Sequence, residues 1–449
     1  MASTTVFRGL TDVRLGVLAT AAILAGCAAS GITQPLQTGA EIATALPIAT
    51  HRVSWTASEA KRDDLLDHGR RPSNYGVLYS FGLPPDGNSP HAGLIDVQDT
   101  LYGTTAEGGA YGCGTYNCGG TVFSVTTGGT EKVLHSFGEL PDGNIPAASL
   151  IDVNGTLYGT TQAGGAYRQG TVFSITLDGA EKVLHSFGNG KDGAYSSAGL
   201  ISIKGTLYGT TSEGGLNGSG TVFSITTDGS ENVLHSFAGG TDGAYPGAGL
   251  LYVDGTLYGT TLGGGVDNSC HRTPPGCGTV FSIAPDGTEN VLHSFGKGAD
   301  GTLPLGSLVD VKRTLYGTTW YGGAYNACPL GRRNGCGTVF SITTGGTEEV
   351  LHSFGQGTDG AYPVAGMIDV DGTLYGTTEE GGASGTHSYG TVFSITTGGT
   401  EKVVHNFGPS TGNDGFLPGA PLIDVKGTLY GTTVMGGAQD GGVVFALTP

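Results

Sequence analysis

The sequence predicts an all-β protein: a seven-bladed β-propeller of four-stranded antiparallel blades, whose ring is closed by an N-terminal strand. Two observations lead to this fold class. A motif, LYGTT, recurs at intervals of 50 to 59 residues, a period typical of stacked or radial repeats of one structural unit. Each interval also contains four short strand patterns bounded by turn residues, which is the content of one propeller blade. The seven copies of the motif begin at Leu101, Leu157, Leu207, Leu257, Leu315, Leu374 and Leu429.

The composition agrees with a folded repeat protein. Glycine supplies 85 of the 449 residues, and these glycines stand at fixed places in each repeat without a collagen-like period. Charged residues make up only 13% of the chain, which is too few for a disordered polyampholyte. The net charge of −18 and the absence of a basic cluster in the repeats argue against nucleic-acid binding, because phosphate contacts need lysine and arginine.

The second repeat shows the four strands in order. Residues 133–137 (VLHSF) form an apolar run that is followed by an Asp-Gly turn, and residues 149–153 (SLIDV) form the next. Asn154-Gly155 is the strongest short hairpin signal and leads into residues 157–161 (LYGTT). A glycine-rich loop then reaches residues 171–175 (TVFSI), after which another turn opens the following repeat. Placed in blade order from the axis outwards, the strands are LIDV, LYGTT, GTVFSIT and VLHSF.

The frame of the repeats predicts how the ring closes. Residues 77–81 (VLYSF) copy the outer VLHSF strand, although no complete repeat precedes them. Residues 443–447 (VVFAL) copy the third strand of a blade, and no VLHSF strand follows them. We therefore expect residues 77–81 to pair beside residues 443–447, which removes the open edges of the array.

The N-terminus has the features of an export signal. Arg8 and Arg14 precede an apolar run, residues 15–25, that is too short to be a good membrane span. The run ends in Leu-Ala-Gly-Cys27, which resembles a bacterial lipobox, so residues 1–26 are expected to be a lipoprotein signal peptide and Cys27 the lipidated residue. Residues 27–75 would then be a flexible tether and residues 76–449 the propeller. The alternative is an ordinary cleaved signal with a spare cysteine.

The repeat text itself resembles a known family. GTLYGTT..GG…GTVFSIT..GTEKVLHSF…DG..P…LIDV is similar to the GloVer (Gloeo_Verruco) tandem repeat of bacterial "choice-of-anchor" surface proteins, over residues 77–449. The resemblance implies a surface protein in which the lipobox serves as the anchor, and it implies no catalytic residues. Tyr79 departs from the pattern where other repeats have histidine, and Ser196 where others have proline. Because Ala28 is not an acidic retention residue, we expect an outer-membrane lipoprotein, facing the periplasm or the surface.

One face of the propeller carries the variable segments. The loop after LYGTT and the connection after VLHSF share that face, and the loop is long in the first, fourth and fifth repeats (residues 106–119, 262–277 and 320–336). These loops hold all cysteines other than Cys27, which we expect to form local disulfides in an oxidising compartment. Zinc is the rival interpretation, but no CxxC spacing occurs. The expected pairs are Cys113 with Cys118, Cys270 with Cys277, and Cys328 with Cys336.

The loops after LYGTT also carry aromatic residues. Exposed aromatic rings suit stacking on sugar rings or anchoring of a partner protein. The alternative is that the rings pack within their own loops. The candidate ligand contacts are Trp320, Tyr321, Tyr325, Tyr111, Tyr116, Tyr167 and Tyr389.

A histidine recurs in the fourth strand of six repeats, and an aspartate recurs in the Asp-Gly turn of all seven. The fourth-strand histidines of different blades lie too far apart to share one ion, so we expect each to make a hydrogen bond to a neighbouring strand or turn. One aspartate in each Asp-Gly turn is far short of the oxygens that calcium requires. No metal and no cofactor are expected. The histidines are His135, His185, His235, His293, His352 and His405, and the turn aspartates are Asp86, Asp142, Asp192, Asp242, Asp300, Asp359 and Asp414.

Three classes of function remain open. The favoured one is a monomeric, lipid-anchored binding or scaffold protein whose ligand is a glycan or an envelope protein. The second is a propeller hydrolase or lyase acting on extracellular polysaccharide, which needs a pair of carboxylates apart from the repeat pattern. Its candidates, among which no recognisable pair stands out, are Glu107, Glu213, Glu379, Glu380 and Asp267. The sequence contains no Asp-box and no GxSxG motif, so no catalytic residue is assigned. A purely structural surface protein is the third.

Overall fold

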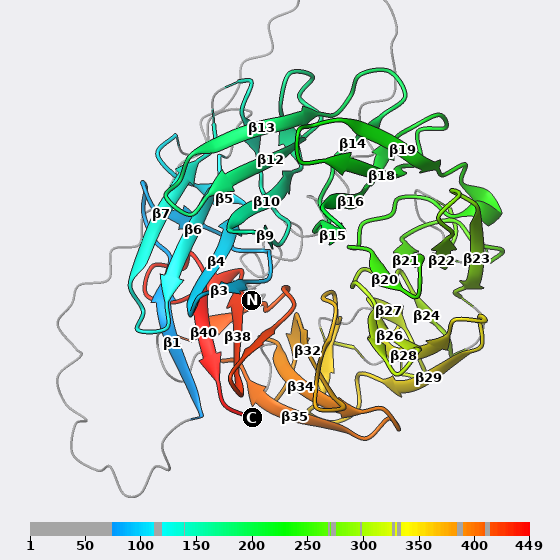
Figure 1. Cartoon of the computed structure of the whole chain (residues 1–449). Coiled ribbons are helices and arrows are strands. Elements are labelled where there is room, and N and C mark those ends of the chain that lie inside the picture. The colour runs from blue at the N-terminus through cyan, green and yellow to red at the C-terminus, as the bar shows by residue number, and fades with distance from the viewer. Residues whose placement is uncertain are drawn as a thin grey trace, which may run out of the picture.

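The computed structural model describes residues 74–449 except 112–118, 139, 268–269, 271–274, 297–298, 326–327, 330–333, 384–388 and 409–413. Seven four-stranded antiparallel sheets stand side by side around a central axis (Figure 1). The described residues contain no α-helix, and a short 3₁₀ turn lies at Gly240–Asp242. The protein is therefore the all-β, seven-bladed β-propeller that the repeats predict. No helix among the described residues has the length and apolar character needed to cross a bilayer.

Each blade runs from a short inner strand to a long outer strand. Blade 1 is β3 (Ile95–Val97), β4 (Thr100–Thr105), β6 (Thr121–Thr126) and β7 (Glu131–Ser136); blade 2 is β9 (Ile151–Val153), β10 (Thr156–Thr161), β12 (Thr171–Thr176) and β13 (Glu181–Ser186). Blade 3 is β15 (Ile201–Ile203), β16 (Thr206–Thr211), β18 (Thr221–Thr226) and β19 (Glu231–Ser236); blade 4 is β20 (Leu251–Val253), β21 (Thr256–Thr261), β22 (Thr279–Ile283) and β23 (Glu289–Ser294). Blade 5 is β25 (Val309–Val311), β26 (Thr314–Thr319), β28 (Thr338–Thr343) and β29 (Glu348–Ser353); blade 6 is β31 (Ile368–Val370), β32 (Thr373–Thr378), β34 (Thr391–Thr396) and β35 (Glu401–Asn406).

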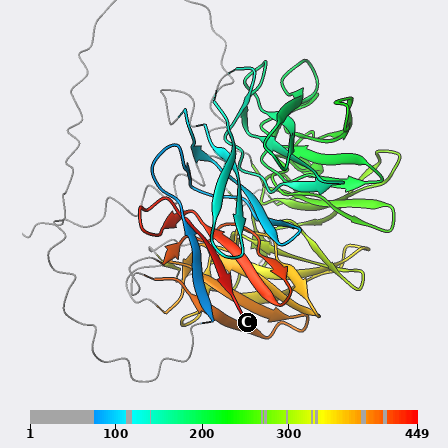
Figure 2. The same ribbon diagram turned by 60° about the vertical axis from the view of Figure 1, so that its left-hand side comes forward.

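Blade 7 is built from both ends of the described chain. Its inner strands are β37 (Ile423–Val425), β38 (Thr428–Thr433) and β40 (Val443–Leu447), and its outer strand is β1 (Tyr75–Ser80). Val77 lies opposite Phe445 in the register of the pair. Both views show blue β1 alongside red β40 (Figures 1 and 2). The predicted closure of the ring is confirmed, and β1 begins at Tyr75 rather than at residue 77.

The turn chemistry of each hairpin follows from its sequence. Val153 pairs with Thr156, so only Asn154 and Gly155 remain to turn the chain between β9 and β10. Both residues have positive φ angles, 56° and 80°, as a two-residue hairpin of this kind requires. Asp152 accepts a hydrogen bond from the Gly155 amide at 2.9 Å and supports the turn.

The blades are joined through repeated aromatic and polar contacts. The phenylalanine that directly follows each outer strand meets the phenylalanine in the third strand of the next blade in an edge-to-face arrangement, as Phe137 and Phe173 do with ring centroids 5.1 Å apart. Closer to the axis, Thr104 donates a hydrogen bond across the junction to the carbonyl oxygen of Ala148 at 3.1 Å. The phenylalanine contact occurs at all seven junctions, including Phe407 with Phe445 at the closure. The core is therefore a ring of interfaces between blades rather than one central cluster.

Candidate ligand-binding face

The variable loops and the Asp-Gly turns meet on one face of the propeller. In blade 2 the turn contributes β8 (Gly143–Asn144), which pairs with β11 (Ala163–Gly164) in the loop after LYGTT. We call the surface formed by the loops after LYGTT and the connections after the outer strands the loop face. The predicted grouping of these segments on one face is confirmed. The equivalent pairs are β2 (Gly87–Asn88) with β5 (Glu107–Gly108), β14 (Gly193–Ala194) with β17 (Glu213–Gly214), β24 (Gly301–Thr302) with β27 (Tyr321–Gly322), β30 (Gly360–Ala361) with β33 (Glu380–Gly381), and β36 (Gly415–Phe416) with β39 (Met435–Gly436).

The recurrent histidines hold these turns in place. Nε2 of His135 lies 3.0 Å from Oδ2 of Asp142, whose other oxygen accepts the amide of Gly143 at 2.7 Å. In the first repeat, the hydroxyl of Tyr79 donates to Asp86 at 2.9 Å and takes over the role of the histidine. The predicted hydrogen bond from histidine to a turn is thus confirmed for His135, His185, His293 and His352, whereas Nε2 of His235 and of His405 lies beside its aspartate without a hydrogen bond among the described residues. The corresponding pairs are His185–Asp192, His235–Asp242, His293–Asp300, His352–Asp359 and His405–Asp414.

A glutamate from the next blade joins several of these pairs. At three junctions the ligand-type atoms of histidine, aspartate and glutamate lie within 4.8 Å of one another, which are donor atoms that a divalent cation can use. This grouping was not predicted, because the glutamate belongs to the blade after that of the histidine; its recurrence at the start of the outer strand was the available signal. The groups are His135, Asp142 and Glu181; His235, Asp242 and Glu289; and His293, Asp300 and Glu348.

Two of the long loops are closed by disulfides. Cys270 is bonded to Cys277 in blade 4, and Cys328 is bonded to Cys336 in blade 5, with Cα atoms 5.3 and 5.4 Å apart. Both predicted pairs are confirmed. Cys277 and Cys336 are fully buried, so each bond ties the loop to the interior of its blade. The third expected pair, Cys113 with Cys118, lies outside the described residues, as does Cys27.

Three of the candidate aromatic residues lie on the surface of the loop face. Tyr111, Tyr167 and Tyr325 are 55%, 49% and 36% exposed. Each lies beside the glycine that stands two residues after the outer strand of its own blade. A Cβ atom on Gly138 would stand 2.7 Å from Tyr111, and Cβ atoms on the equivalent glycines would stand 3.0 Å from Tyr167 and 3.6 Å from Tyr325. The hydroxyl of Tyr325 also donates to the side chain of Gln356 at 3.2 Å. These tyrosines therefore occupy equivalent places in blades 1, 2 and 5.

The other described candidates are packed more deeply. Trp320 and Tyr321 are only 5% and 4% exposed, and their rings stack on each other with centroids 4.6 Å apart. They share a core cluster with Cys328 and Cys336, as the packing alternative proposed. Tyr389 is partly buried and meets Phe416 edge-on at 5.7 Å. Tyr116 lies outside the described residues. Trp320 and Tyr321 thus have almost no surface to offer a ligand, whereas the three exposed tyrosines do.

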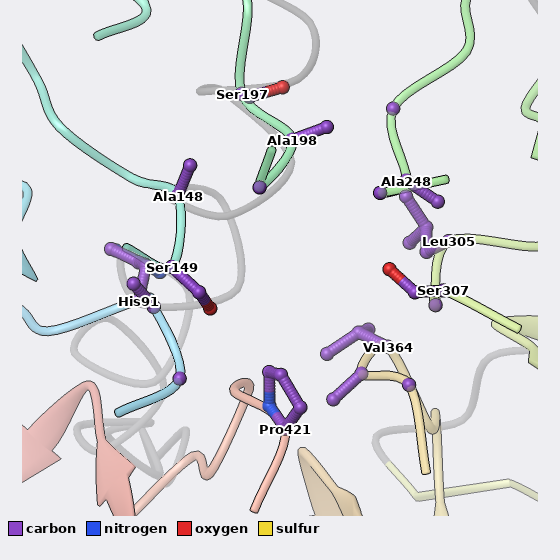
Figure 3. A pocket seen from close by; sticks show the side chains of 18 of the residues that line it. His91, Ala148, Ser149, Ser197, Ala198, Ala248, Leu305, Ser307, Val364 and Pro421 are labelled. Carbon is purple, nitrogen blue, oxygen red and sulfur yellow. The ribbon is translucent and has the colours of Figure 1, made fainter. Parts of the chain in front are cut away.

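A small pocket lies on the axis of the propeller (Figure 3). It has a volume of about 140 Å³ and is lined by the small residues that precede the inner strand of every blade. Because these segments run from the Asp-Gly turns to the inner strands, the pocket is at the loop-face end of the axis. Ser149 and Ser307 point into it from opposite sides (Figure 3). His91 is the one ionisable side chain of the lining, and burial lowers its pKa to about 4, so it is neutral at pH 7.

The acidic candidates for an enzyme occupy the segment after the second strand in different blades. Glu379 and Glu380 are 2% and 1% exposed, and a Cβ atom on the pocket residue Gly419 would stand 3.6 Å from Oε1 of Glu379. Burial raises the pKa of Glu213 to about 7 and also raises that of Glu107. Of the five candidates, Glu379 is thus the one that the structure brings beside the pocket.

The fold and the loop face define a class of protein: a repeat β-propeller with long, disulfide-closed loops on one face. The model of the Gloeobacter/Verrucomicrobia repeat matches residues 70–272, 115–330 and 325–449, which together span most of the sequence. The chain therefore belongs to the Gloeobacter/Verrucomicrobia repeat family. No curated protein matches the sequence.

Solved structures resemble the chain in fold alone. A quinohemoprotein alcohol dehydrogenase from Comamonas testosteroni aligns with a TM-score of 0.51 at 11% identity, covering 84% of this chain and 77% of that one. A putative 6-phosphogluconolactonase from Bacteroides uniformis gives a TM-score of 0.45 at 15% identity, covering 74% and 89%. A gluconolactonase from Xanthomonas campestris gives 0.37 at 16% identity, covering 63% and 82%. At these identities, an activity cannot be transferred to this protein.

Proposed function

We propose that the protein is an exported, lipid-anchored binding protein that holds a neutral glycan on its loop face. The observation that carries the proposal is the set of exposed tyrosines at equivalent places in blades 1, 2 and 5. Tyrosine rings stack on the apolar faces of sugars, and their hydroxyl groups supply hydrogen bonds at the edge. Repeated blades present such rings at regular positions, which suits a polymer of repeated sugars.

The loops between these tyrosines extend the apolar character of the face. Leu216 in blade 3 is 62% exposed, and Val266 in blade 4 is 58% exposed. Each follows the Gly-Gly pair of its loop, one position before the place of the tyrosine in the other blades. The first five blades thus all expose an apolar or aromatic side chain at this part of the loop face, and single exposed groups of this kind would otherwise have little reason to recur.

Charge and pocket size favour an extended neutral polymer over the other ligands. A chain of net charge −18 repels anionic polysaccharides, particularly at low ionic strength. The axial pocket, at about 140 Å³, is smaller than the roughly 300 Å³ at which sites for small organic ligands begin. Binding across the surface of the loop face therefore fits the geometry better than capture in the pocket.

The proposed localisation of the protein is supported by the disulfides and by the N-terminal sequence. Disulfides form in oxidising compartments, and two are present in the loop face, which supports export. Cys27 lies outside the described residues, and its lipidation is proposed from the Leu-Ala-Gly-Cys sequence alone. On this proposal, the lipid holds the propeller at the outer membrane through the tether of residues 27–75.

One observation supports the alternative of a hydrolase or lyase for extracellular polysaccharide. Glu379 and Glu380 are adjacent and almost fully buried, and Glu379 lies beside the axial pocket. Buried carboxyl groups at a pocket are a common feature of catalytic sites. This enzyme would cleave the polymer that the loop face holds, so shortening of a polysaccharide by the protein, lost in Glu379→Gln, would favour it.

The binding proposal is tested by substitution of the exposed tyrosines. Purified protein with intact disulfides is titrated with neutral polysaccharides, alongside the triple variant Tyr111→Ala, Tyr167→Ala, Tyr325→Ala. We expect at least a tenfold weaker affinity in the variant, since loss of one stacking contact costs about 1 kcal/mol. Tyr252→Ala is the matched control, because Tyr252 is 43% exposed but lies on the inner strand β20. Equal affinity of the triple variant and the wild type, or capture of a protein but no polysaccharide, would contradict the proposal.

A further inference from the structure

The junctions between blades contain a glutamate with one carboxylate oxygen that is buried and has no hydrogen-bond partner among the described residues. Glu181, the first residue of β13, has Oε1 buried without a hydrogen-bond partner among the described residues, and it stands within 4.8 Å of His135 and Asp142 of the preceding blade. The same oxygen is buried and unpartnered at every position where an outer strand begins with glutamate. These residues, which we call the junction glutamates, are Glu131, Glu181, Glu231, Glu289, Glu348 and Glu401.

The aspartate of the junction already has hydrogen-bond partners of its own. At the junction of blades 1 and 2, Oδ2 of Asp142 lies 3.0 Å from Nε2 of His135, and Oδ1 accepts a hydrogen bond from the Gly143 amide. Bonds of this kind stabilise a carboxylate. A second carboxylate close to it in a partly buried site needs a compensating positive charge, which either a proton or a metal ion can supply.

The junction between blades 6 and 7 indicates whether a proton or a metal ion supplies the positive charge. The outer strand of blade 7 is β1, and its residue Tyr75 takes the position of the junction glutamate. Tyr75 pairs with Leu447 in the same way as Glu131 of blade 1 pairs with Val125. Tyr75 stacks on His405 at 4.0 Å. Burial, the charge of Asp414 and a hydrogen bond to it raise the pKa of the Tyr75 hydroxyl, which therefore keeps its proton. A protonated phenol thus fills the glutamate position in this junction.

The junction between blades 7 and 1 likewise has a protonated phenol, here in place of the histidine. Tyr79 replaces histidine there, and its hydroxyl donates to Asp86 at 2.9 Å. A neutral phenol is a good hydrogen-bond donor but a poor substitute for imidazole as a ligand of a divalent cation. Both natural replacements keep a proton donor facing the aspartate, and they favour a proton over a metal ion.

We propose that the junction glutamates bind a proton in the folded protein and share it with the turn aspartate of the preceding blade, which makes the propeller a proton-binding ring that is most stable in acid. Six acid pairs would then join the blades along the rim of the loop face. An exported protein meets the pH of its surroundings directly, so this device would adjust the stability of the ring to that pH.

The titration of the glutamates supports the direction of this effect. Burial, and after it the charge of the neighbouring aspartate, raises the pKa of Glu131, Glu181, Glu231, Glu289 and Glu348 from 4.5 to about 7. The groups that face each glutamate are the aspartate and the histidine of the preceding blade, with Tyr79 in place of histidine for Glu131, and Glu349 also acts on Glu348. Because the pKa in the folded chain exceeds the ordinary value, the stabilisation is complete below about pH 4.5 and is lost as the pH rises through 7.

The test is thermal unfolding of the full-length protein between pH 5 and pH 8. We expect the melting temperature of the wild type to fall by about 5 °C over this range through the junction glutamates. The multiple variant Glu131→Gln, Glu181→Gln, Glu231→Gln, Glu289→Gln, Glu348→Gln keeps a permanent amide donor at each position. Its melting temperature should therefore match that of the wild type at pH 5 and exceed it at pH 8. An unchanged pH slope in this variant would overturn the proposal.

Single substitutions give a decision if the multiple variant fails to fold. Glu348→Gln should reduce the fall in melting temperature between pH 5 and pH 8 by about 1 °C, whereas Glu349→Gln, at its exposed neighbour in β29, should change this fall far less, because the charge of Glu349 is the smallest of the influences on Glu348. The same measurements are made with EDTA and with added Zn²⁺, Mn²⁺ or Ca²⁺. A rise in melting temperature with one of these ions that Glu348→Gln abolishes would show that the junction binds a metal ion, and would overturn the proposal.

Discussion

At the scale of single residues, the histidine and aspartate pairs explain why the loop face keeps its shape. In six histidines Nε2, and in Tyr79 the hydroxyl group, lies close to the carboxylate of the following Asp-Gly turn, seven or nine residues further along the chain. The bond links the outer strand to the turn from which the inner strand of the next blade departs. These residues therefore serve the architecture of the site rather than its chemistry.

This role predicts the effect of removing one hydroxyl group. Tyr79→Phe keeps the ring and deletes only the bond to Asp86, which retains the amides of Gly82 and Gly87 as donors. We expect the free energy of unfolding to fall by about 1 kcal/mol, the usual value of a partly exposed hydrogen bond to a carboxylate. Denaturation in urea measures the change. Tyr252→Phe, which alters an exposed ring on β20, is the control, and an equal loss in both variants would show that the bond to Asp86 contributes nothing.

The sequence predicted the partners of the histidines better than the fate of the aromatic residues. A histidine that recurs in a strand before an Asp-Gly turn has few other groups within reach. By contrast, the pattern WYGGAYN contains both buried Trp320 and half-exposed Tyr325, and only the path of the loop decides which ring turns inwards. The junction glutamates escaped notice for a similar reason, because their partners belong to the neighbouring blade.

At the scale of elements, the closing strand β1 is the segment on which the ring depends. Apart from β1, the strands of blade 7 lie more than 340 residues further along the chain, and Val77 packs partly buried against the core of that blade. An incomplete blade would leave the edge of β40 open to other chains. The N-terminal strand and the C-terminal strand are thus expected to form together or not at all.

Two substitutions in β1 separate its packing from its charge. Val77→Asp places a carboxylate in the partly buried cluster, and we expect it to lower the free energy of unfolding by about 2 to 4 kcal/mol. Gly76→Asp puts the same charge on the same strand, where a Cβ atom has no neighbour within 4 Å, and it should be close to neutral. Urea denaturation compares the two variants, and similar stabilities for both would show that β1 does not close the ring through packing.

The elements themselves could be predicted closely because each is short and bounded by turn residues. Asn154-Gly155 predicts one hairpin, and the same spacing recurs in the other blades. A strand boundary that is ambiguous in one repeat can therefore be predicted from the others. The small strand pairs of the loop face, such as β8 with β11, were not predicted. Each has only two residues per strand, and they pair because the turn is already held by Asp142.

At the scale of the whole molecule, the number of blades follows from the repeats, but the axial pocket does not. The lining comes from seven segments that are at least about fifty residues apart in sequence and meet only when the ring is closed. The small residues before each inner strand were the available signal. Whether these small residues line a pocket depends on how closely the blades approach the axis, and the sequence of one repeat does not give that distance.

Hydrogen exchange is the most direct test of the proposal that the loop face binds the ligand. Amide exchange is measured in the full-length protein with and without a neutral polysaccharide that it binds. We predict slower exchange in residues 107–111, 163–169 and 321–325 of the loop face, and no change in the turns at 154–155, 204–205 and 254–255 on the opposite face. Slower exchange confined to the turns of the opposite face, or spread equally over both faces, would contradict the account.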